Sequence, residues 1–177
     1  MTMLSPSAYL ILAGMLLPAL CRAGGLEDQM KAIYVTKMTD FIEWPAEPGP
    51  GIKAEPYVIG VIGKTPVLPF LEEMAGRWRI GGHPVSVRNI SQLDEIPGCR
   101  ILFVAGSEEH RLGEILDKAA GRPILTVGDT KGYGEKGILI NFYVESDYLR
   151  FEINVRAAHT STLKFSSKLL KLARIVS

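Results

Sequence analysis

The sequence predicts a single α/β domain, in which a mostly parallel β-sheet carries helices on both faces and a C-terminal antiparallel hairpin plus helix. Short apolar runs at residues 57–63, 99–105 and 123–127 are typical of strands buried on both faces, as in parallel sheets. Segments with helical spacing alternate with these runs, which favours repeated βαβ units. Two runs of alternating apolar and polar residues follow near the C-terminus and predict an antiparallel hairpin.

The first predicted element of the domain is a helix over residues 26–44. Its apolar residues recur at helical spacing, and Trp44 ends it because a residue before proline avoids the helical conformation. Two interpretations fit its apolar face. The helix either packs on the core, or stays partly exposed until a partner covers it, with Phe41 and Trp44 as anchors.

The next elements alternate between loops, strands and helices. They are predicted as a loop at 46–56, a strand at 57–63, a short helix at 67–76, a strand at 84–90, a capped helical turn from 91, the central strand at 99–105, a helix ending at Gly121 and a strand at 123–127. The strand at 84–90 alternates in polarity and is therefore expected nearer an edge of the sheet. Ser107 is expected to cap the helix that follows the central strand, because a serine hydroxyl can bind free backbone N–H groups.

The last part of the chain is predicted to be a hairpin and a helix. The hairpin strands cover residues 138–145 and 149–155. The final helix carries an apolar stripe made of Leu169, Leu172, Ala173 and Val176. Its basic residues lie largely away from that stripe, and form either a solvated face or a surface for anionic lipid or an acidic partner. They are Lys164, Lys168, Lys171 and Arg174.

Residues 1–23 are predicted to be a cleavable signal peptide. Residues 8–20 are apolar throughout, about the length of a signal-peptide core and short for a membrane span, and Cys21 and Ala23 place small residues before the cleavage site. No Lys or Arg precedes the apolar core, so only the N-terminal amine is positive there. We expect an exported mature domain at residues 24–177, with an uncleaved membrane anchor as the alternative.

The mature chain has balanced charge and one cysteine. Arg22 is the one charged residue of the predicted signal peptide, so its removal from the 20 basic residues leaves 19 basic against 19 acidic residues. A neutral chain has no long-range field to attract nucleic acid, so no nucleic-acid partner is expected. Cys99 remains as the single cysteine, which excludes an intrachain disulfide. Its expected role is that of a small buried hydrophobe at a strand edge.

No motif in the chain indicates catalysis. Gly63-Lys64-Thr65 has the form of the end of a phosphate-binding P-loop, but that motif also needs a glycine where Val58 stands. The three histidines are scattered without the spacing of metal ligands, and no serine occupies a nucleophile elbow. We expect a protein that is not an enzyme and has no metal site and no cofactor.

A small ligand has one favoured location in the predicted fold. In open parallel sheets, ligands bind at the carboxyl ends of strands, near the point where the strand order reverses. For the common doubly wound order, this rule places Lys64, Ser107 and Asp129 around one crevice. The Gly-rich turn at 128–134 offers backbone N–H groups to an anion, although most such turns only reverse the chain. A small-ligand-binding sensor module is therefore the alternative function.

Six ordered motifs cover essentially the whole mature chain. They are Phe41-Ile42-Glu43-Trp44-Pro45, Cys99-Arg100-Ile101-Leu102-Phe103-Val104, Ile124-Leu125-Thr126-Val127-Gly128-Asp129, Ile140-Asn141-Phe142, Arg150-Phe151-Glu152-Ile153-Asn154 and Leu163-Lys164-Phe165-Ser166-Ser167-Lys168-Leu169-Leu170-Lys171-Leu172-Ala173. Together they resemble the YfiR family of periplasmic regulators.

The resemblance implies a periplasmic protein without enzymatic activity. Relatives bind the periplasmic sensor region of an inner-membrane diguanylate cyclase of the YfiN type, repress synthesis of cyclic di-GMP and so restrain biofilm formation, and some form dimers. The family is broad, so another membrane sensor protein is the alternative partner that the resemblance implies. Redox-responsive relatives carry paired cysteines in intrachain disulfides, and the mature chain departs from them because it has only Cys99.

Overall fold

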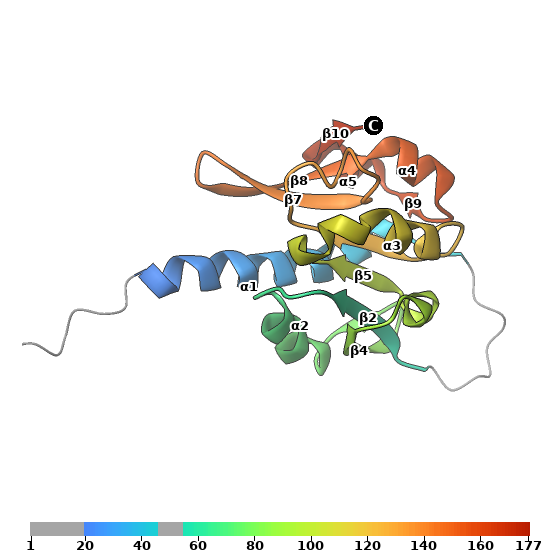
Figure 1. Cartoon of the computed structure of the whole chain (residues 1–177), viewed down its shortest axis with the longest axis horizontal. Helices are drawn as coiled ribbons and strands as arrows, with labels where there is room; N and C mark the ends of the chain where they lie inside the picture. Colours follow the sequence, from blue (N-terminus) through green and yellow to red (C-terminus); the bar gives the residue numbers. More distant parts are fainter. Residues whose placement is uncertain (1–19, 46–54) are drawn as a thin grey trace, which may run out of the picture.

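The computed structural model describes residues 20–45 and 55–177, and it is an α/β domain built on one large sheet (Figure 1). Eight strands lie in the order β10-β8-β7-β6-β5-β2-β4-β3. The predicted signal peptide lies almost wholly outside the described residues, as does most of the predicted loop at 46–56. Over the part of the chain that is described, no helix has the length and apolar character needed to cross a membrane.

The five parallel strands have the doubly wound order that the sequence predicts. They are β2 (Tyr57–Ile62), β4 (His83–Ile90), β5 (Ile101–Val104), β6 (Leu125–Gly128) and β7 (Ile140–Glu145). β5 pairs with β2 on one side and β6 on the other, and its four residues are all buried. β4 lies next to the edge strand β3 (Arg79–Ile80), as its alternating pattern indicates.

The predicted hairpin is confirmed. β7 and β8 (Tyr148–Asn154) pair antiparallel from Ile140↔Ile153 to Glu145↔Tyr148. Ser146 and Asp147 form the turn with φ values of 50° and 65°, the left-handed region expected for a two-residue hairpin loop. β10 (Arg174–Val176) then pairs parallel with β8 and forms the edge of the sheet.

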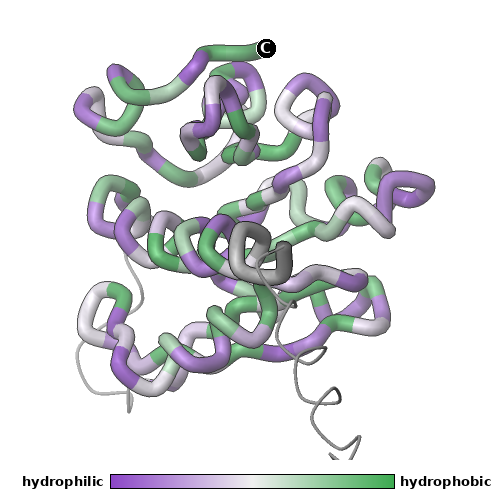
Figure 2. The backbone as a smooth tube through the Cα atoms, turned by 90° about the vertical axis from the view of Figure 1, so that its left-hand side faces the viewer, coloured by the Kyte–Doolittle hydropathy of each residue, from purple (hydrophilic) through white to green (hydrophobic). Residues whose placement is uncertain are grey.

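Helices cover both faces of the sheet, and each face has its own hydrophobic core. The first core joins α1 (Leu20–Met38), α2 (Leu68–Ala75) and α5 (Ser167–Leu172) to strand residues such as Phe103. The second joins α3 (Leu112–Ala119) and the short helical segment η2 (Leu93–Gly98) to residues such as Leu102. Hydrophobic and hydrophilic stretches therefore alternate over short intervals along the chain (Figure 2).

The first helix ends earlier than the sequence predicts. α1 stops at Met38, the 3-10 helix η1 (Thr39–Phe41) follows, and Ile42 takes extended φ and ψ values of −124° and 125°. The reason is a two-stranded sheet in which β1 (Ile42–Glu43) pairs with β9 (Lys164–Phe165). The core-packing interpretation of α1 is confirmed over its C-terminal part, where Ala32, Val35 and Met38 are buried, and Tyr34 stacks on Phe142 of β7 at 6.3 Å.

The final helix is also shorter than predicted, and its predicted apolar stripe is wrong. Ser166 caps the N-terminus of α5. The helix ends at Leu172 because residues 174–176 are extended and pair with β8. Leu169 is buried, whereas Leu172 is 74% exposed. The predicted basic stripe is therefore divided, with Lys164 on β9, Lys168 and Lys171 on α5, and Arg174 on β10.

Cys99 is buried, as the sequence predicts. Its thiol lies 3.8 Å from the carbonyl oxygen of Glu95, and a side chain at Gly60 would collide with it. Burial raises the pKa of the Cys99 thiol to about 11. Because the thiolate is the reactive form, the folded protein holds this cysteine unreactive at neutral pH.

We expect alkylation of Cys99 at pH 8 to be at least about 100-fold slower in the folded protein than in urea, because a rise of two pKa units removes that fraction of thiolate and burial adds to it. Mass spectrometry of the iodoacetamide adduct measures both rates. Equal alkylation rates in the two states would contradict this account.

The same pKa shift makes the free energy of unfolding fall as the pH rises from about 9 towards 11, because the unfolded chain loses the thiol proton first.

Candidate functional site

Phe41 and Trp44, the predicted partner anchors, lie on a firmly held segment between the first helix and the sheet. Phe41 is 40% exposed, and its carbonyl oxygen accepts a 2.9 Å hydrogen bond from the Ser166 N–H. Trp44 differs from it because its half-buried side chain packs against the first core. Phe41 is therefore the more accessible of the two, and the role of both in partner binding stays a prediction.

A cavity of about 390 Å³ opens beside Trp44, at the edge where the parallel strands begin. One wall comes from the segment after α1, and the other comes from the starts of β2 and β4, from β3 and from the residue before β5. Its lining includes the side chains of Asp40, Ile42, Trp44, Ile80, His83 and Arg100. No motif in the sequence marks this place.

Aromatic rings and one guanidinium form a continuous stack in the cavity wall. The Arg100 Cζ atom lies 5.6 Å from the ring centre of Trp44 and 4.3 Å from that of Tyr57, and Arg100 Nη2 donates a 2.9 Å hydrogen bond to Tyr57 Oη. His83 stacks on Tyr57, with ring centres 4.3 Å apart and planes 7° from parallel. These are cation–π and stacked arrangements, which hold flat groups in fixed positions.

The sheet explains why these residues meet. Tyr57 opens β2, His83 opens the neighbouring β4, and Arg100 precedes β5 on the other side. Their positions carry no periodic pattern, so sequence reasoning missed them. The available signal was that aromatic and basic residues stand at the starts of three parallel strands.

The predicted crevice residues Lys64, Ser107 and Asp129 do lie at one edge of the sheet, because they follow the neighbouring strands β2, β5 and β6. The Lys64 backbone N–H donates a 2.9 Å hydrogen bond to Ser107 Oγ. A Cβ atom at Gly63 would come within 2.5 Å of the same oxygen, and Gly63 has a φ of 90° that favours glycine. The ends of β2 and β5 therefore approach each other closely at the strand-order reversal.

The prediction that Ser107 caps a helix is wrong. Ser107 lies inside the 3-10 helix η3 (Gly106–Arg111), whose N-cap position is Ala105, and α3 begins only at Leu112. The hydroxyl is directed to the β2 end instead, where it accepts the Lys64 bond. The tight approach of the β2 and β5 ends decides this orientation.

Asp129 is bound by a lysine from the first helix. Lys31 Nζ lies 2.9 Å from Asp129 Oδ2, 2.8 Å from Glu27 and 3.4 Å from Asp28. Burial alone would lower the pKa of Lys31, but the bonds to Glu27 and Asp129 outweigh it and raise that pKa above its usual value. The ion pairs tie α1 to the carboxyl edge of the sheet.

A second buried polar network joins the hairpin to the loop at 129–139. Glu152, with 3% of the residue exposed, accepts a 2.9 Å bond from Asn141 Nδ2 and bonds from Arg174, one of them at 3.0 Å from Nε. Asn154 Nδ2 donates to the Gly134 carbonyl at 2.7 Å. The Gly-rich loop thus packs on protein groups, and its predicted role in anion binding stays a prediction. Within the described ranges, no cluster of three or more His, Cys, Asp or Glu residues is suited to a metal ion.

Lys31→Met should lower the free energy of unfolding by about 2 kcal/mol, because it leaves buried Asp28 and half-buried Asp129 without their cation. Urea denaturation followed by circular dichroism measures this change. Lys37→Met is the matched control on the same helix, since Lys37 is exposed and its replacement should change stability by less than about 0.5 kcal/mol. Equal effects of the two substitutions would show that the ion pairs do not hold α1.

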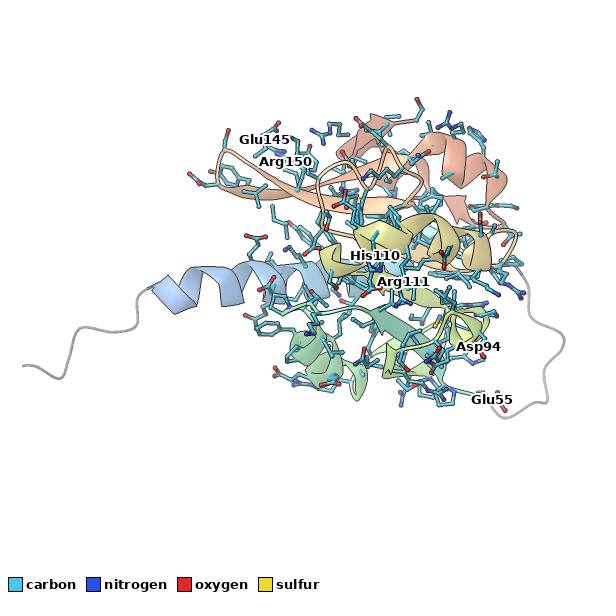
Figure 3. All side chains as sticks on the ribbon, in the orientation of Figure 1. Glu55, Asp94, His110, Arg111, Glu145 and Arg150 are labelled. Carbon is cyan, nitrogen blue, oxygen red and sulfur yellow. The ribbon has the colours of Figure 1, made fainter. Side chains whose placement is uncertain are left out.

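Glu152→Gln should lower the free energy of unfolding by about 2 kcal/mol, because it weakens buried hydrogen bonds to a charged group while keeping the side-chain volume. Glu145→Gln is the control, since Glu145 and Arg150 form an exposed pair on the hairpin (Figure 3). That control should change stability by less than about 1 kcal/mol. If thermal or urea unfolding gave the two variants the same stability, the network would not stabilise the hairpin.

Comparison with known proteins identifies the family of the chain. No curated protein matches it in sequence. The profile of the YfiR/HmsC-like family, a regulatory family, matches residues 28–174. The matched range includes the cavity, the hairpin network and all of the Lys31 network except Glu27. The match extends from α1 to the first residue of β10, which is nearly the whole described domain. The chain belongs to the YfiR/HmsC-like family.

Proposed function

We propose that this protein is a periplasmic regulator that binds and represses an inner-membrane diguanylate cyclase, and so lowers cyclic di-GMP and biofilm formation. Family membership over residues 28–174 is the observation that carries the proposal. Export by the predicted signal peptide at residues 1–23 would place the domain in the same compartment as the sensor region of such a cyclase. A homodimer is a further assembly that fits this role.

The surface around Phe41 supports the proposal. An aromatic side chain on a rigid support is the kind of residue that dominates the binding energy of protein–protein interfaces. Its burial removes a large apolar area from water and costs little conformational entropy. Phe41 has such a support, since the backbone on both sides of it is held by η1 and by the β1–β9 pairing. We therefore place the partner against Phe41, with Trp44 at the inner side of the contact.

A small-ligand-binding sensor is the second candidate function. Lys64 and Ser107 stand at the reversal of strand order, where doubly wound folds bind ligands. Two interactions occupy that edge: the hydrogen bond between Lys64 and Ser107, and the ion pair between Lys31 and Asp129. Their presence favours the regulator as the main proposal.

Phe41→Ala should weaken binding of the cyclase sensor region by about 30-fold, which corresponds to a hot-spot loss of about 2 kcal/mol. The partner is first captured by crosslinking in the native host, and its periplasmic region is then titrated against the purified protein by calorimetry. In cells lacking this protein, cyclic di-GMP measured by mass spectrometry should rise, and the Phe41→Ala protein should restore it only in part.

Tyr148→Ala is the matched control, because Tyr148 is an exposed aromatic side chain on the hairpin of the eight-stranded sheet, whereas Phe41 adjoins the separate β1–β9 sheet. Its binding affinity and its ability to restore cyclic di-GMP should equal those of the unmodified protein. Thermal unfolding must show that both variants are folded. Unchanged affinity of folded Phe41→Ala would remove this surface from the interface, and unchanged cyclic di-GMP in the deletion strain would refute the regulator itself.

A further inference from the structure

We infer that the β10 edge of the eight-stranded sheet binds an extended acidic segment of a partner protein, which adds to the sheet as a further strand. The inference goes beyond the proposed function and does not depend on it, because Phe41 adjoins the separate β1–β9 sheet. Three features of the edge define the chemistry of the segment: its open backbone groups, its exposed apolar side chains and its positive charge.

The first observation is a strand with an open outer side. β10 is the last strand in the sheet order and lies at the top of Figure 1. The Asn154 N–H donates to the Leu139 carbonyl oxygen on the β7 side, so the alternate residue Ile153 directs its backbone groups towards β10. In a parallel ladder, such a residue bonds to the neighbours of the residue opposite it. Ile175 lies opposite Ile153 and therefore directs its own N–H and carbonyl groups away from β8.

The second observation is exposed apolar surface beside these groups. Ile175 is 49% exposed although it lies opposite buried Ile153, and Leu172 at the end of α5 is 74% exposed. The chain from Leu172 to Ile175 spans at most about 11 Å, so both side chains lie near the open edge. An incoming strand would cover the Ile175 side chain while it binds the Ile175 backbone groups.

The third observation is the charge around this edge. Residues 155–177 contain five basic residues and no acidic residue. Of the five, Arg174 is bound by Glu152. Lys168 and Lys171 lie on the exposed side of α5, and neither forms an ion pair with another described residue. Carboxylates on an incoming strand would supply the missing counter-charges.

The same charge decides between possible occupants of the edge. A second copy of the chain would bring its own lysines to the same place, and like charges on edge strands oppose pairing between copies. A lipid surface would meet the lysines but would not continue the ladder of backbone hydrogen bonds. An acidic polypeptide strand satisfies the backbone groups, the Ile175 side chain and the lysines together.

The probe is a short capped peptide in which glutamate and valine alternate. The protein is purified after expression of the full chain and labelled with ¹⁵N, and nuclear magnetic resonance is the measurement. The peptide should shift the Ile175 N–H signal saturably at millimolar concentration. The signals of Arg79 and Ile80 should stay in place, because these residues form β3 at the other end of the sheet.

Matched peptides separate the charge of the probe from its backbone. A peptide of alternating lysine and valine should bind at least about 10-fold more weakly, because its charges repel those of the edge. The glutamate peptide with a methylated backbone keeps its charge but lacks N–H donors, so it should give no saturable shift of the Ile175 signal.

Ile175→Pro tests the backbone contact. It removes the outward N–H and spares the pairing with β8, so it should weaken binding by about 10-fold, measured by the fluorescence anisotropy of a labelled peptide. Ile175→Val is the control, because it keeps the N–H and most of the apolar side chain. Its affinity should stay within about 2-fold of that of the unmodified protein.

The double variant Lys168→Gln with Lys171→Gln tests the charge and should weaken binding by about 5-fold. The control is Lys118→Gln with Lys131→Gln, which makes the same change in net charge at exposed residues. Lys118 lies on α3, which covers the opposite face of the sheet from α5. This control should bind the peptide as tightly as the unmodified protein.

Thermal unfolding must show that the variants are folded, and the lysine variants keep the test decisive if Ile175→Pro does not fold. The inference would be overturned by the absence of a saturable Ile175 shift, by equal shifts at β3, or by unchanged affinity of folded Ile175→Pro. An Ile175 shift on dilution without peptide would identify a second copy as the occupant and overturn it too. So would a saturable shift with phosphatidylglycerol vesicles and none with the peptide. Phe41→Ala should bind the peptide normally, so failure of this inference and failure of the regulator proposal are separate outcomes.

Discussion

Burial of β5 on both faces is the constraint on which the rest of the structure depends. A strand whose four residues are all buried needs strands on both sides and a covering layer on each face. β2 and β6 supply the neighbours, α1 and α2 supply one layer, and α3 with η2 supplies the other. With these layers in place, the parallel strands begin at one edge of the sheet and end at the opposite edge. The cavity beside Trp44 lies at the first edge, and Lys64, Ser107 and Asp129 lie at the second.

The two edges of the sheet have different chemistry. At the carboxyl edge, Ser107 closes on the β2 end and Lys31 neutralises Asp129, so the polar groups bind one another. At the amino edge, large flat side chains stand against each other and leave a cavity. The chain therefore uses the edge where related folds bind ligands to attach α1, and keeps a cavity at the other edge.

Sequence patterns predicted the elements whose partners lie across a regular interface. The apolar runs at β2, β5 and β6 and the alternation of β7 and β8 have a simple period, so their strands and even the placement of Lys64, Ser107 and Asp129 at one edge were predictable. β1, β9 and β10 have only two or three residues and show no period. Residues 174–176 continue a helical pattern, and only pairing with β8 overrides it.

Polarity was misleading where a loop covers a strand. Asn141, Glu152 and Asn154 stand at positions that alternation assigns to solvent, yet the loop at 129–139 buries them. No local pattern in the sequences of β7 and β8 indicates that a loop covers these residues. The stack of Trp44, Arg100, Tyr57 and His83 has no periodic signal either, because its members come from four separate segments.

The contact between Tyr34 and Phe142 also determines the order in which the domain can be completed. It joins the first helix to a strand near the end of the chain, and such distant contacts form late because a long loop must close first. While the chain emerges, α1 can pack on α2 and the first strands early, but Tyr34 lacks its stacking partner until β7 exists. A truncation before β7 would leave the Tyr34 side of α1 uncovered, and a chaperone that covers this side during synthesis would limit aggregation.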